Sequence, residues 1–147
     1  MENEWKTKLA NFFEELRIIQ SSVSETLMDF SHFCEFIAEP AFEILGEELN
    51  QYHLSSSIKK IKDKSISLQI QFPKSSIDNY YYTISLPDNA VELKLRLRSG
   101  GQSDFIDEPF MEQVAPKELL QLEKDILIKD VIRLYRKFCF ESHMNPK

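Results

Sequence analysis

The chain has 147 residues, of which 42% are hydrophobic and 29% charged, and its formal net charge is −6. Three glycines and six prolines are too few for a low-complexity or disordered protein. We therefore expect one globular domain over residues 1–147. The acidic start and the lack of an apolar run of about 18 residues favour a cytoplasmic protein without a secretory signal or a membrane span.

The N-terminal third carries the longest regular pattern. It predicts a long helix, which Pro40 is expected to stop or kink. A short second helix should follow, so that residues 1–50 are helical. Apolar positions alternate in steps of four and three over more than four heptads, with one polar residue among them. They are Trp5, Leu9, Phe12, Leu16, Ile19, Val23, Thr26, Phe30, Phe33 and Ile37.

The middle of the chain predicts an antiparallel sheet. Apolar and polar residues alternate strictly in three stretches, Ile66–Phe72, Tyr80–Leu86 and Val91–Leu97. A fourth strand within Ser57–Lys62 is a weaker prediction, because its two isoleucines do not share a strand face. The sequence thus predicts a meander of three to four strands over residues 57–98.

The strand register follows from the apolar positions and the short turns. Tight hairpins set Ile84 opposite Leu93 and Ile70 opposite Tyr82. In this register every inward position is apolar in all three strands. A slip of one residue would turn a whole apolar set toward water, so we expect this pairing to be strongly specified.

The C-terminal part predicts a loop and a second cover for the sheet. Residues 98–110 are expected to form a loop, and residues 116–140 a helix with Pro116 in its first turn. A sheet with one apolar face must be covered. The predicted fold class is therefore α+β, with a long N-terminal helix and a C-terminal helix covering one face of the meander and the other face in water.

The outer face of the predicted sheet is basic, although the chain as a whole is acidic. The predicted register gathers Tyr81, Lys94, Arg96 and Arg98 there. The simplest interpretation is an ordinary solvated face or protection of an edge strand. The functional interpretation is a binding surface for an acidic protein segment. Nucleic acid is not an expected partner, because single strands require several stacking rings among the basic groups.

The long helix is the stronger functional signal. More than 30 residues span about 50 Å, which exceeds the width of three strands. Part of its apolar stripe must therefore contact the C-terminal helix, the short second helix or another chain. Trp5, Phe12 and Phe13 are the candidate partner-binding residues on this helix.

No residue pattern predicts catalysis, a metal site or a cofactor. Cys34 and Cys139 are the only cysteines, lie in helical patterns and lack metal-ligand spacing. We expect them to be buried thiols, although the sequence leaves a disulfide between them open. His32 lies two residues from Cys34 on the helix, so the two side chains diverge.

Taken together, these features favour a small non-catalytic protein-interaction module, such as an adaptor, an inhibitor or immunity protein, or an assembly factor. It would act through helix packing and a basic sheet face, and bind another protein or a second copy of itself. Membranes are not expected partners. The alternative is a small-molecule-binding domain or enzyme with an aromatic pocket between sheet and helices, lined by Tyr80, Tyr82 and phenylalanine side chains.

Overall fold

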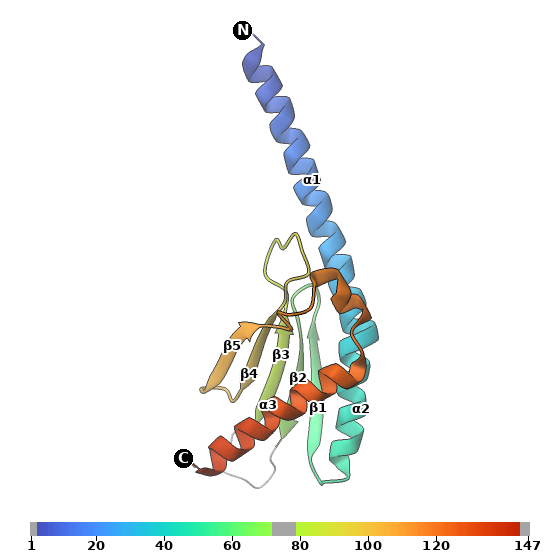
Figure 1. Ribbon diagram of the computed structural model, residues 1–147, viewed down its shortest axis with the longest axis vertical. Helices are drawn as coiled ribbons and strands as arrows, with labels where there is room; N and C mark the ends of the chain where they lie inside the picture. Colours follow the sequence, from blue (N-terminus) through green and yellow to red (C-terminus); the bar gives the residue numbers. More distant parts are fainter. Residues whose placement is uncertain (1–2, 72–78, 145–147) are drawn as a thin grey trace.

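The computed structural model describes residues 3–71 and 79–144 and consists of a helical rod, a sheet and a crossing helix (Figure 1). The rod comprises α1 (Glu4–Phe33), the π-helical turn η1 (Cys34–Ala38) and α2 (Glu39–Asn50). The sheet comprises β1 (Ser55–Ile61), β2 (Ser65–Gln71), β3 (Tyr80–Ser85), β4 (Arg96–Gly100) and β5 (Phe105–Pro109). The chain then continues into the 3₁₀ helix η2 (Pro116–Gln121) and α3 (Lys124–Met144).

The predicted α+β class and antiparallel meander are confirmed. The strands lie in the order β1-β2-β3-β4-β5, and each pairs antiparallel with the next. The possible fourth strand is present as β1. The prediction of a loop over residues 98–110 was wrong, because Phe105–Pro109 pairs with β4. This edge strand is mostly exposed on both faces, so it has no apolar alternation to reveal it.

The predicted register was wrong, although the side-chain faces of Leu93, Leu95 and Leu97 and of the described parts of β2 and β3 were predicted correctly. Ile84 pairs with Leu97 rather than Leu93, a shift of four residues. Ile70 pairs with Tyr80 rather than Tyr82, a shift of two. Both shifts are even, so the predicted apolar side chains within β2, β3 and β4 still point inward. Val91, in contrast, lies outside β4 and is 50% exposed, contrary to the prediction. Phe72 lies outside the described residues. The β3–β4 connection is a long excursion rather than a tight turn, and the β4 strand therefore begins later than expected.

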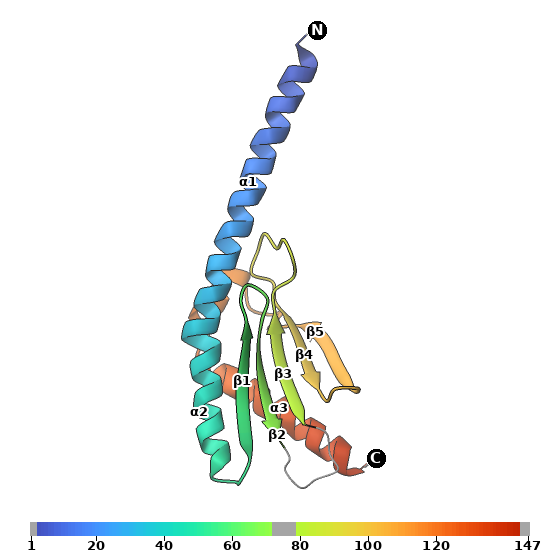
Figure 2. The same ribbon diagram turned by 180° about the vertical axis from the view of Figure 1, so that it is seen from behind.

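The core lies between the sheet and the helices. The inward side chains of β2 and β3 have no exposed surface: Ile66, Leu68, Ile70, Tyr80, Tyr82 and Ile84. Leu127 and Val131 of α3 and Phe42 of α2 are buried against this layer. Figure 2, which looks at the sheet from the opposite side, shows α3 crossing behind the strands and α2 beside β1. The cover is thus formed by α2, α3 and only the last part of α1.

Of the two effects predicted for Pro40, a stop or a kink of the helix, the structure shows no stop, and the predicted short second helix is present as α2. Proline has no N–H to donate to the preceding turn and its ring crowds the carbonyl four residues earlier. The structure accommodates both effects by a π-helical turn over Cys34–Ala38, after which Pro40 lies in the first turn of α2. The helical run therefore continues to Asn50. Near the other end, Pro116 occupies the first turn of η2 as expected, but a break at Leu122 separates η2 from α3.

Candidate functional site

The N-terminal part of α1 projects beyond the rest of the molecule (Figures 1 and 2). Thr26 is the first buried residue of this helix, followed by Phe30 and Phe33. Residues 4–25 therefore form an extension of about 33 Å, at 1.5 Å per residue. We call this segment, residues 4–25, the projecting helix.

The heptad positions of α1 form an apolar seam, which is largely uncovered over the projecting helix, at Trp5, Leu9, Phe12, Leu16, Ile19 and Val23. Trp5 is 61% exposed, Phe12 47% and Phe13 58%, and the rings of Phe12 and Phe13 stack with centroids 5.4 Å apart. Soluble monomers rarely expose a contiguous apolar patch of this kind unless it is an interaction site. Other large apolar side chains of this segment are also exposed, namely Leu9, Ile18 and Ile19, whereas Leu16 and Val23 are half-buried.

The docked part of α1 begins around Thr26. The Thr26 hydroxyl donates to the Ser22 carbonyl at 2.8 Å, which satisfies the one polar group of the seam. One turn later the seam enters the core, where the ring of Phe33 packs edge-on to Phe110 at 5.9 Å. The same apolar repeat thus lies mostly in solvent before Thr26 and in the core after it.

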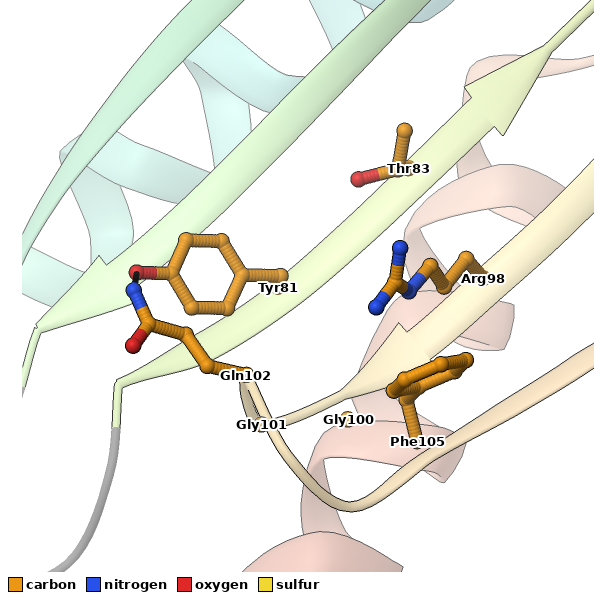
Figure 3. Close-up of a pocket in the computed structure, with 7 residues that line it drawn as sticks. All are labelled: Tyr81, Thr83, Arg98, Gly100, Gly101, Gln102 and Phe105. Carbon is orange, nitrogen blue, oxygen red and sulfur yellow. Dashed lines mark hydrogen bonds between the residues drawn. The ribbon is translucent and has the colours of Figure 1, made fainter.

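The outer face of the sheet has a shallow open hollow at the β3–β4–β5 edge (Figure 3). The guanidinium carbon of Arg98 lies 3.5 Å from the centroid of the Phe105 ring, a cation–π contact. The Gln102 amide donates to the Tyr81 hydroxyl at 3.2 Å. Among the described residues Arg98 forms no ion pair. The full lining is Tyr81, Thr83, Arg98, Gly100, Gly101, Gln102 and Phe105.

The register shift separates the residues that were predicted to lie together on the basic outer face of the sheet. Tyr81 and Arg98 meet in the hollow. Arg96 instead donates two hydrogen bonds to Asp107 of β5, at 2.8 and 3.2 Å. Lys94 precedes β4 and pairs with Glu92 at 3.2 Å. Sequence reasoning missed Phe105 and Gln102 because they lie in the segment interpreted as a loop.

The aromatic residues expected to line an internal pocket are part of the filled core. The ring of Tyr82 packs edge-on to Phe42 at 5.9 Å, and its hydroxyl donates to Asp130 at 2.6 Å. The ring of Tyr80 packs against Tyr135, and its hydroxyl shares a 2.7 Å hydrogen bond with Ser99. The polar atoms of both buried tyrosines are thus paired within the protein.

The two cysteines are free, half-buried rather than fully buried as expected, and poorly suited to nucleophilic chemistry. Burial raises the pKa of the Cys34 thiol from its ordinary 9.0 to about 12, while the nearby Lys60 opposes this shift and Glu39 adds to it. Burial also raises the pKa of the Cys139 thiol. Both remain protonated at neutral pH, whereas the thiolate is the reactive form.

Alkaline pH should destabilise the fold. Cys34 ionises near 9.0 in the unfolded chain and near 12 in the folded protein, so between these values the unfolded state binds fewer protons and stability falls as pH rises. Burial and the Asp130 carboxylate raise the pKa of Tyr82 well above 10.0, so this residue also lowers the stability of the fold as pH rises. Urea midpoints measured from pH 7 to about 11 will check this, with Cys34→Ala giving a shallower fall. A constant midpoint would contradict it.

Comparisons with protein-family models, with curated proteins and with solved structures give no match to this chain. Within residues 3–71 and 79–144 no group of three or more His, Cys, Asp or Glu side chains could hold a metal ion. Nor does any helix in the part of the chain that the structure describes have the length and apolarity to cross a membrane. The geometry of the projecting helix is therefore the main basis for a functional proposal.

Proposed function

We propose that this protein is a non-catalytic protein-interaction module that binds its partner through the apolar seam of the projecting helix. The observation that carries the proposal is the exposure of Trp5, Leu9, Phe12 and Ile19 along one face of a helix that is anchored in the core only from Thr26 onward. Burial of such side chains between two helices supplies most of the free energy of coiled-coil association. The role would be that of an adaptor, an inhibitor or an assembly factor.

The hollow on the sheet offers a second and smaller contact surface. Arg98 presents a cation with an aromatic neighbour and no carboxylate partner among the described residues. A carboxylate of an acidic partner segment would add a charge-assisted hydrogen bond there. Such a contact would orient a partner rather than hold it. We place the protein in the cytoplasm, where thiols such as Cys34 and Cys139 stay reduced.

Photocrosslinking in the native cell tests this proposal directly. A photoreactive phenylalanine analogue at position 12 keeps the ring in the seam, whereas the same analogue at Ser21 lies on the opposite, exposed face of α1. We expect one dominant adduct from position 12 and little from position 21. The mass of the adduct identifies the partner as a second copy or as another protein.

Equal labelling from both positions, or no discrete adduct from position 12, would contradict the proposal. A discrete adduct that forms only from position 21 would contradict it as well. Unchanged far-UV circular dichroism of both substituted proteins controls for folding.

A further inference from the structure

The side chains in the seam of the projecting helix become smaller from Trp5 toward Val23. From the N-terminus its six positions are Trp5, Leu9, Phe12, Leu16, Ile19 and Val23. The two large aromatic residues thus occupy the first half and the two β-branched residues the second. The partner that fills such a seam evenly must present small side chains to the first half and large ones to the second.

A second copy in antiparallel orientation meets this requirement. When the two seams overlap completely, Trp5 faces Val23 of the second copy, and Leu9 faces Ile19. Phe12 faces Leu16, and the twofold axis repeats each of these layers. The Trp5–Val23 and Phe12–Leu16 layers then combine a larger with a smaller side chain, the Leu9–Ile19 layer combines two of equal size, and all six seam positions of each chain are covered. Phe13, at the flank of the seam and 58% exposed, meets Phe13 of the second copy at the centre.

Parallel pairing fits the same seam poorly. It sets Trp5 on Trp5 and Val23 on Val23, so the layers are wide at one end of the dimer and narrow at the other. It also brings two globular bodies of an acidic chain, net charge −6, to the same end of the dimer. Antiparallel pairing places these bodies at opposite ends, where their mutual repulsion is screened over more than a Debye length of about 8 Å.

Charge alone would favour a shorter antiparallel overlap, but the ion pairs gained contribute less than the apolar burial lost. Shifting by one heptad sets Lys8 opposite Glu15, whereas the full overlap sets Glu15 opposite Glu15 of the second copy. Exposed ion pairs contribute little to association. The shorter overlap leaves Ile19 and Val23 without a partner side chain, and burying a side chain of this size contributes more than one such ion pair. The full overlap therefore wins.

We infer that the projecting helix pairs antiparallel with the projecting helix of a second copy, centred near Glu14, to form a homodimer. This inference rests on the proposed function and names its partner. In this dimer the site is complete only when the second copy supplies Leu16, Ile19 and Val23 to cover Trp5, Leu9 and Phe12.

Sedimentation equilibrium over a range of concentrations provides the first test. We expect a monomer–dimer equilibrium for the unmodified chain, and Leu9→Gln should raise the dissociation constant about a hundredfold or more because it removes two layers per dimer. Ile18→Gln is the matched control, since Ile18 is as exposed as Leu9, 52% against 48%, but lies outside the seam. Equal effects of the two variants would overturn the inference.

Small-angle scattering distinguishes the two orientations. Residues 4–50 form one helical run, so an antiparallel dimer centred near Glu14 has a maximum dimension of about 110 Å, against about 70 Å for a parallel dimer. Glu15→Gln removes the repulsion at the centre and should tighten the dimer several-fold, whereas in the shorter overlap it would weaken the dimer. A dimension near 70 Å or a weaker Glu15→Gln dimer would overturn the orientation or the register.

Failure of this inference is separable from failure of the proposed function. A chain that stays monomeric at every concentration, together with a discrete adduct between position 12 and a different protein, overturns the homodimer and leaves the interaction module standing. A monomeric chain with no discrete adduct overturns both.

Discussion

Phe33→Ala should lower the free energy of unfolding by about 3–5 kcal/mol, the usual cost of removing a buried aromatic ring. Phe33 has no exposed surface and packs against the Phe110 ring, so the substitution leaves a cavity that the surrounding helices and loops cannot fill. Urea unfolding followed by far-UV circular dichroism measures this loss. Trp5 fluorescence is unsuitable, because Trp5 lies 61% exposed at the far end of the projecting helix.

Phe12→Ala on the same helix is the matched control. The Phe12 ring is 47% exposed and contacts the neighbouring Phe13 ring rather than the core, so its loss should change the unfolding free energy of the monomer by less than about 0.5 kcal/mol. The comparison is made at a protein concentration below the dissociation constant of any dimer. If Phe12→Ala destabilised the monomer as much as Phe33→Ala, the division of α1 into projecting and docked parts would be wrong.

Asp130→Ala should lower the free energy of unfolding by about 2–3 kcal/mol. The Asp130 carboxylate accepts a 2.6 Å hydrogen bond from the hydroxyl of the fully buried Tyr82 and forms an ion pair with Arg133 at 2.8 Å. Hydrogen bonds to a charged group contribute about 1.5–3 kcal/mol, and the truncation leaves the hydroxyl without its acceptor in the core. Thermal and urea unfolding of the purified variant measure the loss.

Two companion variants separate this hydrogen bond from general effects on α3. Lys129→Ala changes an exposed neighbour on the same helix and should be close to neutral. Tyr82→Phe removes the donor itself, so the cost of Asp130→Ala should be smaller when measured in the Tyr82→Phe background. Fully additive losses in the double variant would show that Tyr82 and Asp130 do not interact.

The fold class was predictable because side-chain periodicity is a local property of the chain. Strict alternation placed Ile66, Leu68 and Ile84 on the inner face, and they lie there with no exposed surface. The partner of each residue across the sheet was not predictable in the same way. Shifts of two and four residues keep the same faces inward, so the apolar pattern does not distinguish these registers.

The hollow on the outer face of the sheet could not be predicted from the alternation of apolar and polar residues. β5 is mostly exposed on both faces, and its position depends on pairing with β4 and on the hydrogen bonds between Arg96 and Asp107. Only this pairing brings Phe105 under the Arg98 guanidinium. A Cβ on Gly100, which has a φ of 139°, would lie 2.5 Å from the Asp104 carbonyl oxygen, so the close turn between β4 and β5 requires glycine there.

The heptad seam from Trp5 to Ile37 is determined by the sequence alone, since spacing by four and three places these residues on one helix face in any surroundings. Which part of the seam is covered was decided only by the tertiary structure. η2 and the loop carrying Phe110 bury α1 from Thr26 onward, and η2 also contacts Glu25 through the exposed ion pair with Lys117. Coverage depends on the positions of elements distant in sequence, and so the seam's pattern is uniform while its burial is not.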